Sequence, residues 1–165
     1  MSGPGSAAAG GRVAARLAGL GLRLPQVAAP LASYRPAVRD GDLVWTAGQL
    51  PLVDGRLPRT GRVGEGEGLV PPAEATGLAR TCALNALAAV ASVVGDLDAV
   101  ERVVKVVGFI ASDPAFTGQP AVLNGASDLL AEVFGDAGHH ARSAVGVAVL
   151  PLGAPVEVEL VVRVR

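Results

Sequence analysis

Hydrophobic and polar residues alternate most regularly at the C-terminal end of the chain. Over residues 156–164, one set of alternate positions is Val or Leu throughout, and the other set carries Glu157, Glu159 and Arg163, with Val161 as the exception. A period of two residues is typical of a strand whose side chains point to opposite faces of a sheet. The segment is therefore predicted to be a strand with one buried face.

The preceding segment, residues 142–150, also alternates, but in a different way. Valines at every second position share one face, whereas Arg142 is followed on the other face by Ala, Gly and Ala. A strand face made of such small residues leaves room for close approach. A helix, a neighbouring subunit or a ligand could occupy that space.

Two longer apolar segments have the wider spacing of helices. Residues 72–94 follow Pro71, a residue suited to the start of a helix, and end before Gly95. Their larger apolar side chains fall on one stripe, with Thr, Asn and Ser on the other side. Residues 118–134, bounded by a proline and a glycine, form a second predicted helix, and residues 12–20 a short third one.

The remaining segments complete a mixed sheet. Residues 37–39 and 43–48 flank an Asp-Gly-Asp turn and predict a β-hairpin. Residues 100–112 are too β-branched for a helix and apolar on both faces, which favours a central strand. Two main helices against five or more strands predict an α+β fold with the helices on one face. Residues 1–11 lack bulky side chains and predict a disordered tail, which leaves 12–165 as a single domain.

Composition and charge exclude several classes of protein. The 165 residues carry 14 basic and 15 acidic side chains, and only 3% are aromatic. Proteins that bind nucleic acid usually show a clustered basic excess and often stack bases on aromatic rings, so such a partner is not expected. The longest apolar stretch, residues 82–95, is too short to span a membrane. The first 19 residues lack the apolar core of a signal peptide, so we expect a cytoplasmic location.

Few side chains offer catalytic or metal-binding chemistry. The single cysteine, Cys82, rules out a disulfide within the chain and lies in a helical pattern that predicts a buried thiol. The adjacent His139 and His140 cannot converge on one metal from a strand and are interpreted as exposed loop residues, so no metal site is expected. Lys105 is interpreted as a sheet residue whose ammonium either extends to solvent or is paired. The sequence motifs of P-loops, serine hydrolases and zinc proteases are absent.

Arg142 is the remaining candidate. It begins a predicted strand and faces the surface of small residues described above. A guanidinium group binds a carboxylate through two parallel hydrogen bonds, which suits it to anchor an acidic ligand. It could equally form a structural ion pair with Glu157 or Glu159 on the neighbouring strand. The pattern alone leaves both interpretations open.

Three sequence blocks resemble the RidA/YjgF family of enamine/imine deaminases. They are TAGQLP at 46–51, FTGQPAVLNG at 116–125, and ARSAVGVAVLPLGAPVEVELVVRV at 141–164. The resemblance extends over about residues 30–164, and its C-terminal block is the most specific part. It implies a chorismate-mutase-like α+β fold, with a mixed sheet and two helices on one face, assembled as a homotrimer with a cleft at each subunit interface.

The resemblance also implies a function and a set of site residues. Proteins of this family hydrolyse reactive 2-enamino and 2-imino acids to 2-keto acids and ammonia, without a cofactor, and so limit metabolite damage. The implied roles are Arg142 as the group that holds the substrate carboxylate and Glu159 as the group that helps place water. The remaining pocket positions that match the family are Tyr34, Gly48, Gln49, Asn124 and Ala144.

Several positions depart from the family pattern and define a divergent branch. Hydroxyl, thiol, phenol or carboxyl groups of the family are replaced here by Ala47, Ala144, Ser127 and Gly146. Arg35 could add a second positive charge near the cleft. These departures support an alternative, a non-catalytic trimeric protein that binds small carboxylates in the same cleft. A ribonuclease activity, the third hypothesis, is disfavoured by the charge balance.

Overall fold

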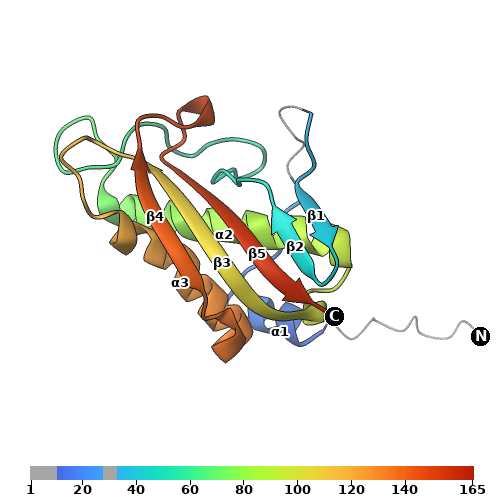
Figure 1. Ribbon diagram of the computed structural model, residues 1–165. Coiled ribbons are helices and arrows are strands. Elements are labelled where there is room, and N and C mark those ends of the chain that lie inside the picture. Colours follow the sequence, from blue (N-terminus) through green and yellow to red (C-terminus); the bar gives the residue numbers. More distant parts are fainter. Residues whose placement is uncertain (1–10, 28–32) are drawn as a thin grey trace, which may run out of the picture.

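A five-stranded mixed sheet forms the centre of the molecule. The structure, a computed structural model, describes residues 11–27 and 33–165, so the predicted tail lies outside the described residues except for Gly11. The sheet order is β1-β2-β5-β3-β4 (Figure 1). All neighbouring strands are antiparallel except β3 and β4, which run parallel. The strands are β1 (Ala37–Asp40), β2 (Leu43–Thr46), β3 (Val100–Ala111), β4 (Ala141–Val147) and β5 (Val156–Val164).

Two helices cover one face of this sheet, as the sequence predicts. α2 (Pro72–Val94) and α3 (Gln119–Phe134) lie side by side behind the strands in Figure 1, and the short α1 (Arg12–Gly19) packs near their ends. By length and mean hydropathy alone α2 would suit a membrane span. Half of its most apolar stretch is buried inside the protein, because α2 packs against the sheet on one side and against its neighbour α3 on another.

The alternation in β5 has the predicted consequence for the core. Its valine and leucine side chains at even-numbered positions are all buried against the helices, and β5 lies between β2 and β3. Matching positions of β3 and the inner face of α2 complete a continuous apolar cluster. Cys82 of α2 is fully buried, as expected, and this burial raises the pKa of its thiol. A thiol that stays protonated is a poor nucleophile, so Cys82 contributes to core packing and not to chemistry.

The small-residue face of β4 is turned toward α3. Because side chains alternate along a strand, Arg142, Ala144 and Gly146 share this face. The neighbouring β3 is equally close to the helix, since a Cβ atom on Gly108 would overlap the Leu123 side chain. The strand ends at Val147 and not at the predicted position 150, because its partner β3 ends at Ala111, opposite Val147.

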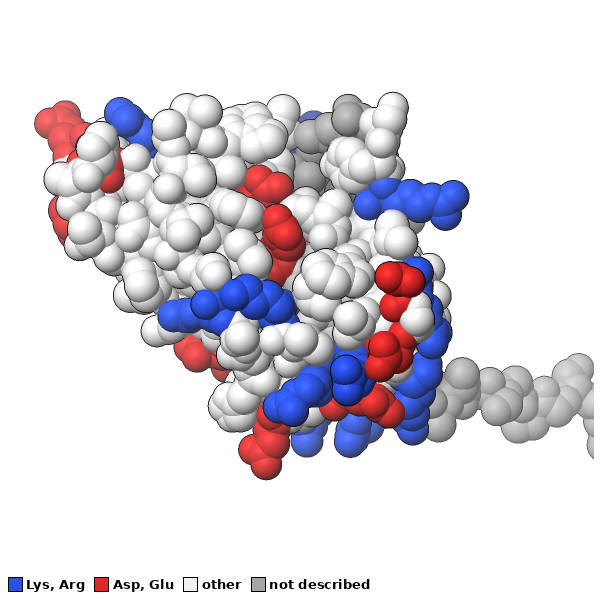
Figure 2. Space-filling model, viewed as in Figure 1, with Lys and Arg blue, Asp and Glu red and all other residues white. Residues whose placement is uncertain are grey.

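On the other face of the sheet, no helix of the described residues packs against the strands. Figure 2 views this face, which is largely uncharged with two acidic side chains near its centre. Trp45 and Val145 are 51% and 44% exposed there. Lys105 lies on the same face and donates a hydrogen bond to the Ser143 hydroxyl at 3.0 Å, so of the two predicted arrangements the paired one is formed. This surface, from Trp45 across β5 and β3 to Val145, is called the open face below.

Candidate functional site

The Arg142 guanidinium is held against α3 by three hydrogen bonds. Its Nη1 donates to Asn124 Oδ1 at 2.8 Å and to Ser127 Oγ at 3.2 Å, and its Nη2 donates to the Pro120 carbonyl at 3.0 Å. A guanidinium has five N–H groups, so two of them make no hydrogen bond to the described residues. The side chain is only partly buried. It is therefore fixed in place and still able to bind a ligand.

The sequence explains why these groups meet. Pro120, Asn124 and Ser127 are four and three residues apart, so they lie on one stripe of α3. Arg142 lies on the face of β4 that is turned toward that stripe. No carboxylate of the described residues forms an ion pair with it. The structural ion pair with Glu157 or Glu159, which the sequence left open, is thus not formed.

A second hydrogen-bonded group adjoins the guanidinium. Ser127 Oγ lies 3.0 Å from His140 Nε2, and His140 Nδ1 lies 2.6 Å from the Gly138 carbonyl oxygen. A carbonyl oxygen only accepts hydrogen bonds, so in the neutral imidazole Nδ1 carries the proton and Nε2 is the acceptor. Ser127 therefore donates to His140 while it accepts from Arg142. The interpretation of His140 as an exposed loop residue is wrong: the side chain is half-buried against α3.

The surroundings of His140 favour its neutral form. Burial lowers the pKa of the imidazole below its ordinary value of 6.5, and the positive charge of Arg142 and the nearby His139 lower it further. The hydrogen bond from Nδ1 to the Gly138 carbonyl acts in the opposite direction, and burial outweighs it. At neutral pH the ring is consequently a hydrogen-bond acceptor at Nε2.

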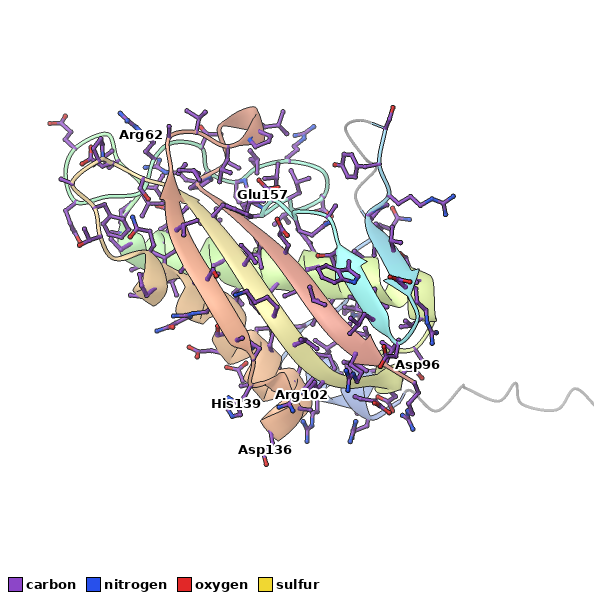
Figure 3. All side chains as sticks on the ribbon, viewed as in Figure 1. Arg62, Asp96, Arg102, Asp136, His139 and Glu157 are labelled. Carbon is purple, nitrogen blue, oxygen red and sulfur yellow. The ribbon has the colours of Figure 1, made fainter. Side chains whose placement is uncertain are left out.

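Glu159 lies on the opposite face of the sheet from Arg142. Val106 pairs with both Arg142 and Leu160, which places Arg142 on the helix side, whereas Glu159 pairs with Val107 and belongs to the open face. Glu157 lies beside it, near the middle of that face in Figure 3. Burial, followed by repulsion from Glu159, raises the pKa of the Glu157 carboxyl. Within one chain, the sheet thus separates the two residues expected to act together.

The loop after β2 brings Gly48 and Gln49 to the Glu157 side of the molecule. A Cβ atom on Gly48 would overlap the Glu157 carboxylate, so only glycine allows this approach. Gln49 is buried, and its backbone exchanges hydrogen bonds of 2.8 and 3.1 Å with Val158. Tyr34 is 46% exposed and lies three residues before β1. These predicted positions do not join Arg142, Asn124 and Ala144 on the helix side.

A small pocket extends the helix-side site along β4. It measures about 290 Å³ and is lined by Ser112, Gln119 and Gly146 among others. Gln119 precedes Pro120, the residue whose carbonyl accepts from Arg142. A Cβ atom on Gly146 would lie 2.8 Å from Gln119 Nε2 and 3.2 Å from Ser112 Oγ. Glycine at this position therefore leaves room in this pocket, which lies four residues along β4 from Arg142.

Sequence reasoning identified Arg142 and Asn124 but missed the pair formed by Ser127 and His140. His140 and Arg142 are two residues apart at the start of a strand, so they share a face. Ser127 is three residues after Asn124 on one helix face. That spacing was a usable signal. No group of three or more potential metal ligands occurs among residues 11–27 and 33–165.

Comparisons with known proteins agree with the architecture. The family model described as "YjgF/chorismate mutase-like, putative endoribonuclease" matches residues 14–164. Protein TCP17 of Trypanosoma cruzi is 46% identical over 161 residues, which cover 97% of this chain and 99% of that protein.

Two crystal structures share both fold and sequence with this chain. The protein Atu1372 of Agrobacterium tumefaciens, of unknown function, is 44% identical with a TM-score of 0.85, and the match covers 93% of each chain. A "putative endoribonuclease" of Shewanella oneidensis is 33% identical with a TM-score of 0.88, covering 92% of this chain and 99% of that one.

Proposed function

The chain belongs to the YjgF/chorismate mutase-like family, and we propose that it hydrolyses 2-enamino and 2-imino acids to 2-keto acids and ammonia without a cofactor. One observation carries this proposal. Arg142 is fixed by three hydrogen bonds to α3, has no carboxylate partner among the described residues, and keeps two N–H groups for a ligand. An arginine held in this way is suited to an acidic small molecule.

The electrostatics of the site favour an anion. The guanidinium contacts the first turn of α3, where the partial positive charge of the helix N-terminus adds to its own. The Ser127 hydroxyl lies 3.2 Å from Arg142 Nη1, so we propose that the imine carbon of a carboxylate bound to Arg142 lies near this hydroxyl.

The reaction needs little from the protein. An imine carbon is already electrophilic, so a site has only to orient it and to accept a proton from one attacking water. A bound carboxylate supplies the orientation. These few requirements fit a site that contains an arginine, an asparagine amide and one imidazole.

We further propose that the working form is a homotrimer with a cleft at each subunit interface. The open face exposes Trp45 and Val145 and carries Glu157 and Glu159 without an ion-pair partner among the described residues. Apolar surfaces of this kind mark protein interaction sites. A second copy that covers the open face could bring its Glu159 toward the Arg142 of its neighbour. A cytoplasmic location remains our prediction from the sequence.

The proposal is tested with imines generated in situ from amino acids by an amino-acid oxidase, with keto-acid release followed against the spontaneous rate. Wild-type protein should accelerate release. Arg142→Lys keeps the charge but cannot replace the three hydrogen bonds and the fork. A charge-assisted hydrogen bond contributes about 1.5–3 kcal/mol, so the apparent affinity should fall about 10- to 150-fold. The proposed activity would be refuted if wild-type protein did not accelerate release, or if Arg142→Lys were as fast as wild type.

One alternative uses the same site without catalysis. The small residues Ala144 and Gly146, which replace larger polar residues of the family pattern, favour a protein that binds small carboxylates as a sensor or regulator. Calorimetry with pyruvate separates the two functions, because saturable binding that Arg142→Ala abolishes, without turnover, would support the binding protein. The name of the Shewanella oneidensis relative suggests a ribonuclease. The formal net charge of −1 gives this chain no basic excess for RNA, and RNA cleavage by purified protein would test that function directly.

A further inference from the structure

We propose that Ser127 and His140 form the proton-accepting pair of the Arg142 site: Ser127 contacts the attacking water, and His140 receives the proton through the serine hydroxyl. This inference rests on the proposed imine hydrolysis and assigns its base. The two side chains come from α3 and from the residue before β4, and they meet at 3.0 Å.

The direction of each hydrogen bond supports this assignment. The Gly138 carbonyl fixes the proton of His140 on Nδ1, which leaves the Nε2 lone pair to accept from the Ser127 hydroxyl. One lone pair of Ser127 Oγ accepts from Arg142 Nη1 at 3.2 Å. The second lone pair remains for a water proton. The chain water–Ser127–His140 is therefore complete except for the water itself.

An activated hydroxyl is built from the same three parts in many enzymes. A nucleophile or water-binding hydroxyl, a base within about 2.6–3.2 Å and a third group that orients the base are the features to look for. Here they are Ser127, His140 and the Gly138 carbonyl. The nearby charges that act on the imidazole are those of Arg142 and His139. Arg142 is positive and His139 is positive or neutral, so neither stabilises the protonated form of the His140 imidazole.

The proton balance of the reaction closes with these groups. Water oxygen attacks C2 of the iminium as the C=N π pair moves to nitrogen. One water proton passes to Ser127 Oγ while the serine proton passes to His140 Nε2, which gives a neutral carbinolamine and an imidazolium. The imidazolium returns its proton through Ser127 to the amino nitrogen. The C–N bond then breaks, the hydroxyl forms the ketone, and its proton leaves with ammonia as ammonium.

The location of the pair distinguishes it from Glu159. Ser127 and His140 are within hydrogen-bond distance of Arg142 or of each other on the helix side of a single chain. Glu159 is on the open face and can approach Arg142 only from another copy. A carboxylate bound to the Arg142 guanidinium would thus lie near the Ser127 hydroxyl, and that hydroxyl donates to the His140 imidazole of the same chain.

The test uses purified full-length protein in the coupled imine assay, with variants that each remove one member of the pair. His140→Asn retains a donor for the Gly138 carbonyl but removes the base, and Ser127→Ala removes the hydroxyl. General-base catalysis contributes about 10²-fold or more, so both variants should lose about 100-fold in kcat. KM should be unchanged in His140→Asn and raised in Ser127→Ala, which also removes a hydrogen-bond acceptor of Arg142. Ser127→Thr should restore the rate. His139→Asn, which changes the exposed neighbouring histidine, should match wild type.

The pH profile supplies a readout that a purely structural role would not move. In wild type, kcat/KM should fall as pH drops below 6.5, because the imidazole becomes protonated. This acidic limb should be absent in His140→Asn. If His140→Asn and Ser127→Ala match His139→Asn, the pair is not the base, although the proposed function stands. If wild type itself gives no acceleration, both proposals fall together.

Discussion

The contact between α2 and α3 gives a prediction with a matched control, because it depends on one glycine. Gly125 is buried on α3, and a Cβ atom there would overlap the Thr76 carbonyl oxygen and lie 2.8 Å from the carbonyl carbon. The obstacle is helix backbone, which cannot rotate away like a side chain. Gly77, on α2, has nothing within 4 Å of its Cβ position. The same substitution at the two positions therefore probes space alone.

The magnitudes follow from two opposing effects. Replacing glycine by alanine inside a helix stabilises by about 1 kcal/mol. Overpacking against a fixed backbone destabilises by up to about 3 kcal/mol, so Gly125→Ala should cost about 2 kcal/mol net. Gly77→Ala should gain about 1 kcal/mol. In a chain of this size these changes correspond to a Tm lower by about 4–8 °C and higher by about 2–4 °C.

The assay is thermal unfolding at one fixed protein concentration, because the proposed trimer would make Tm depend on concentration. Gly125→Ala should also weaken carboxylate binding, since a displaced α3 moves Asn124 and Ser127 away from Arg142. If Gly125→Ala stabilises the protein as Gly77→Ala does, the helices are not in close backbone contact. The α3 position that builds the Arg142 site would then be wrong.

Two further predictions concern carboxylates. The raised pKa of Glu157 means that the fold favours its protonated form and that stability is lost as pH rises through the folded-state pKa. Glu157→Gln should therefore raise Tm at pH 7 but not below pH 4.5. A lower Tm of the variant at pH 7 would contradict this, because it would show that the ionised Glu157 carboxylate has a stabilising partner. Asp98 accepts hydrogen bonds from the backbone amides of Val13 and Arg12 at 2.8 and 2.7 Å, and these bonds lower the pKa of its carboxyl. Its contribution to folding stability is therefore complete above pH 3.8 and is lost as the pH falls through the lowered pKa. Asp98→Ala should speed amide exchange in α1 but leave α2 unchanged, and unaltered exchange in α1 would refute this anchoring role.

The local pattern of hydrophobic and polar residues was sufficient to predict most of the helices and strands. The strand at 156–164 and the helix at 72–94 agree with β5 and α2 residue for residue, because a period of two or of 3.6 identifies the buried side chains directly. The end of β4 was not predictable in this way. Residues 148–150 continue the alternation but have no partner on β3, and pairing depends on the neighbouring strand.

The sequence by itself determined the α+β fold and the family resemblance and pointed to Arg142 as a candidate anchor, since each depends on residue types at short, regular spacing. Only the tertiary structure decided which partners Arg142 has. It placed Asn124 and Ser127 beside the guanidinium, turned His140 toward Ser127, and put Glu159 on the opposite face. The physical reason is that alternation states which residues share a face but not what covers that face. The helix residues that meet Arg142, Ser127 and Asn124, are 15 and 18 residues away in the chain, and their position follows from packing against the whole core.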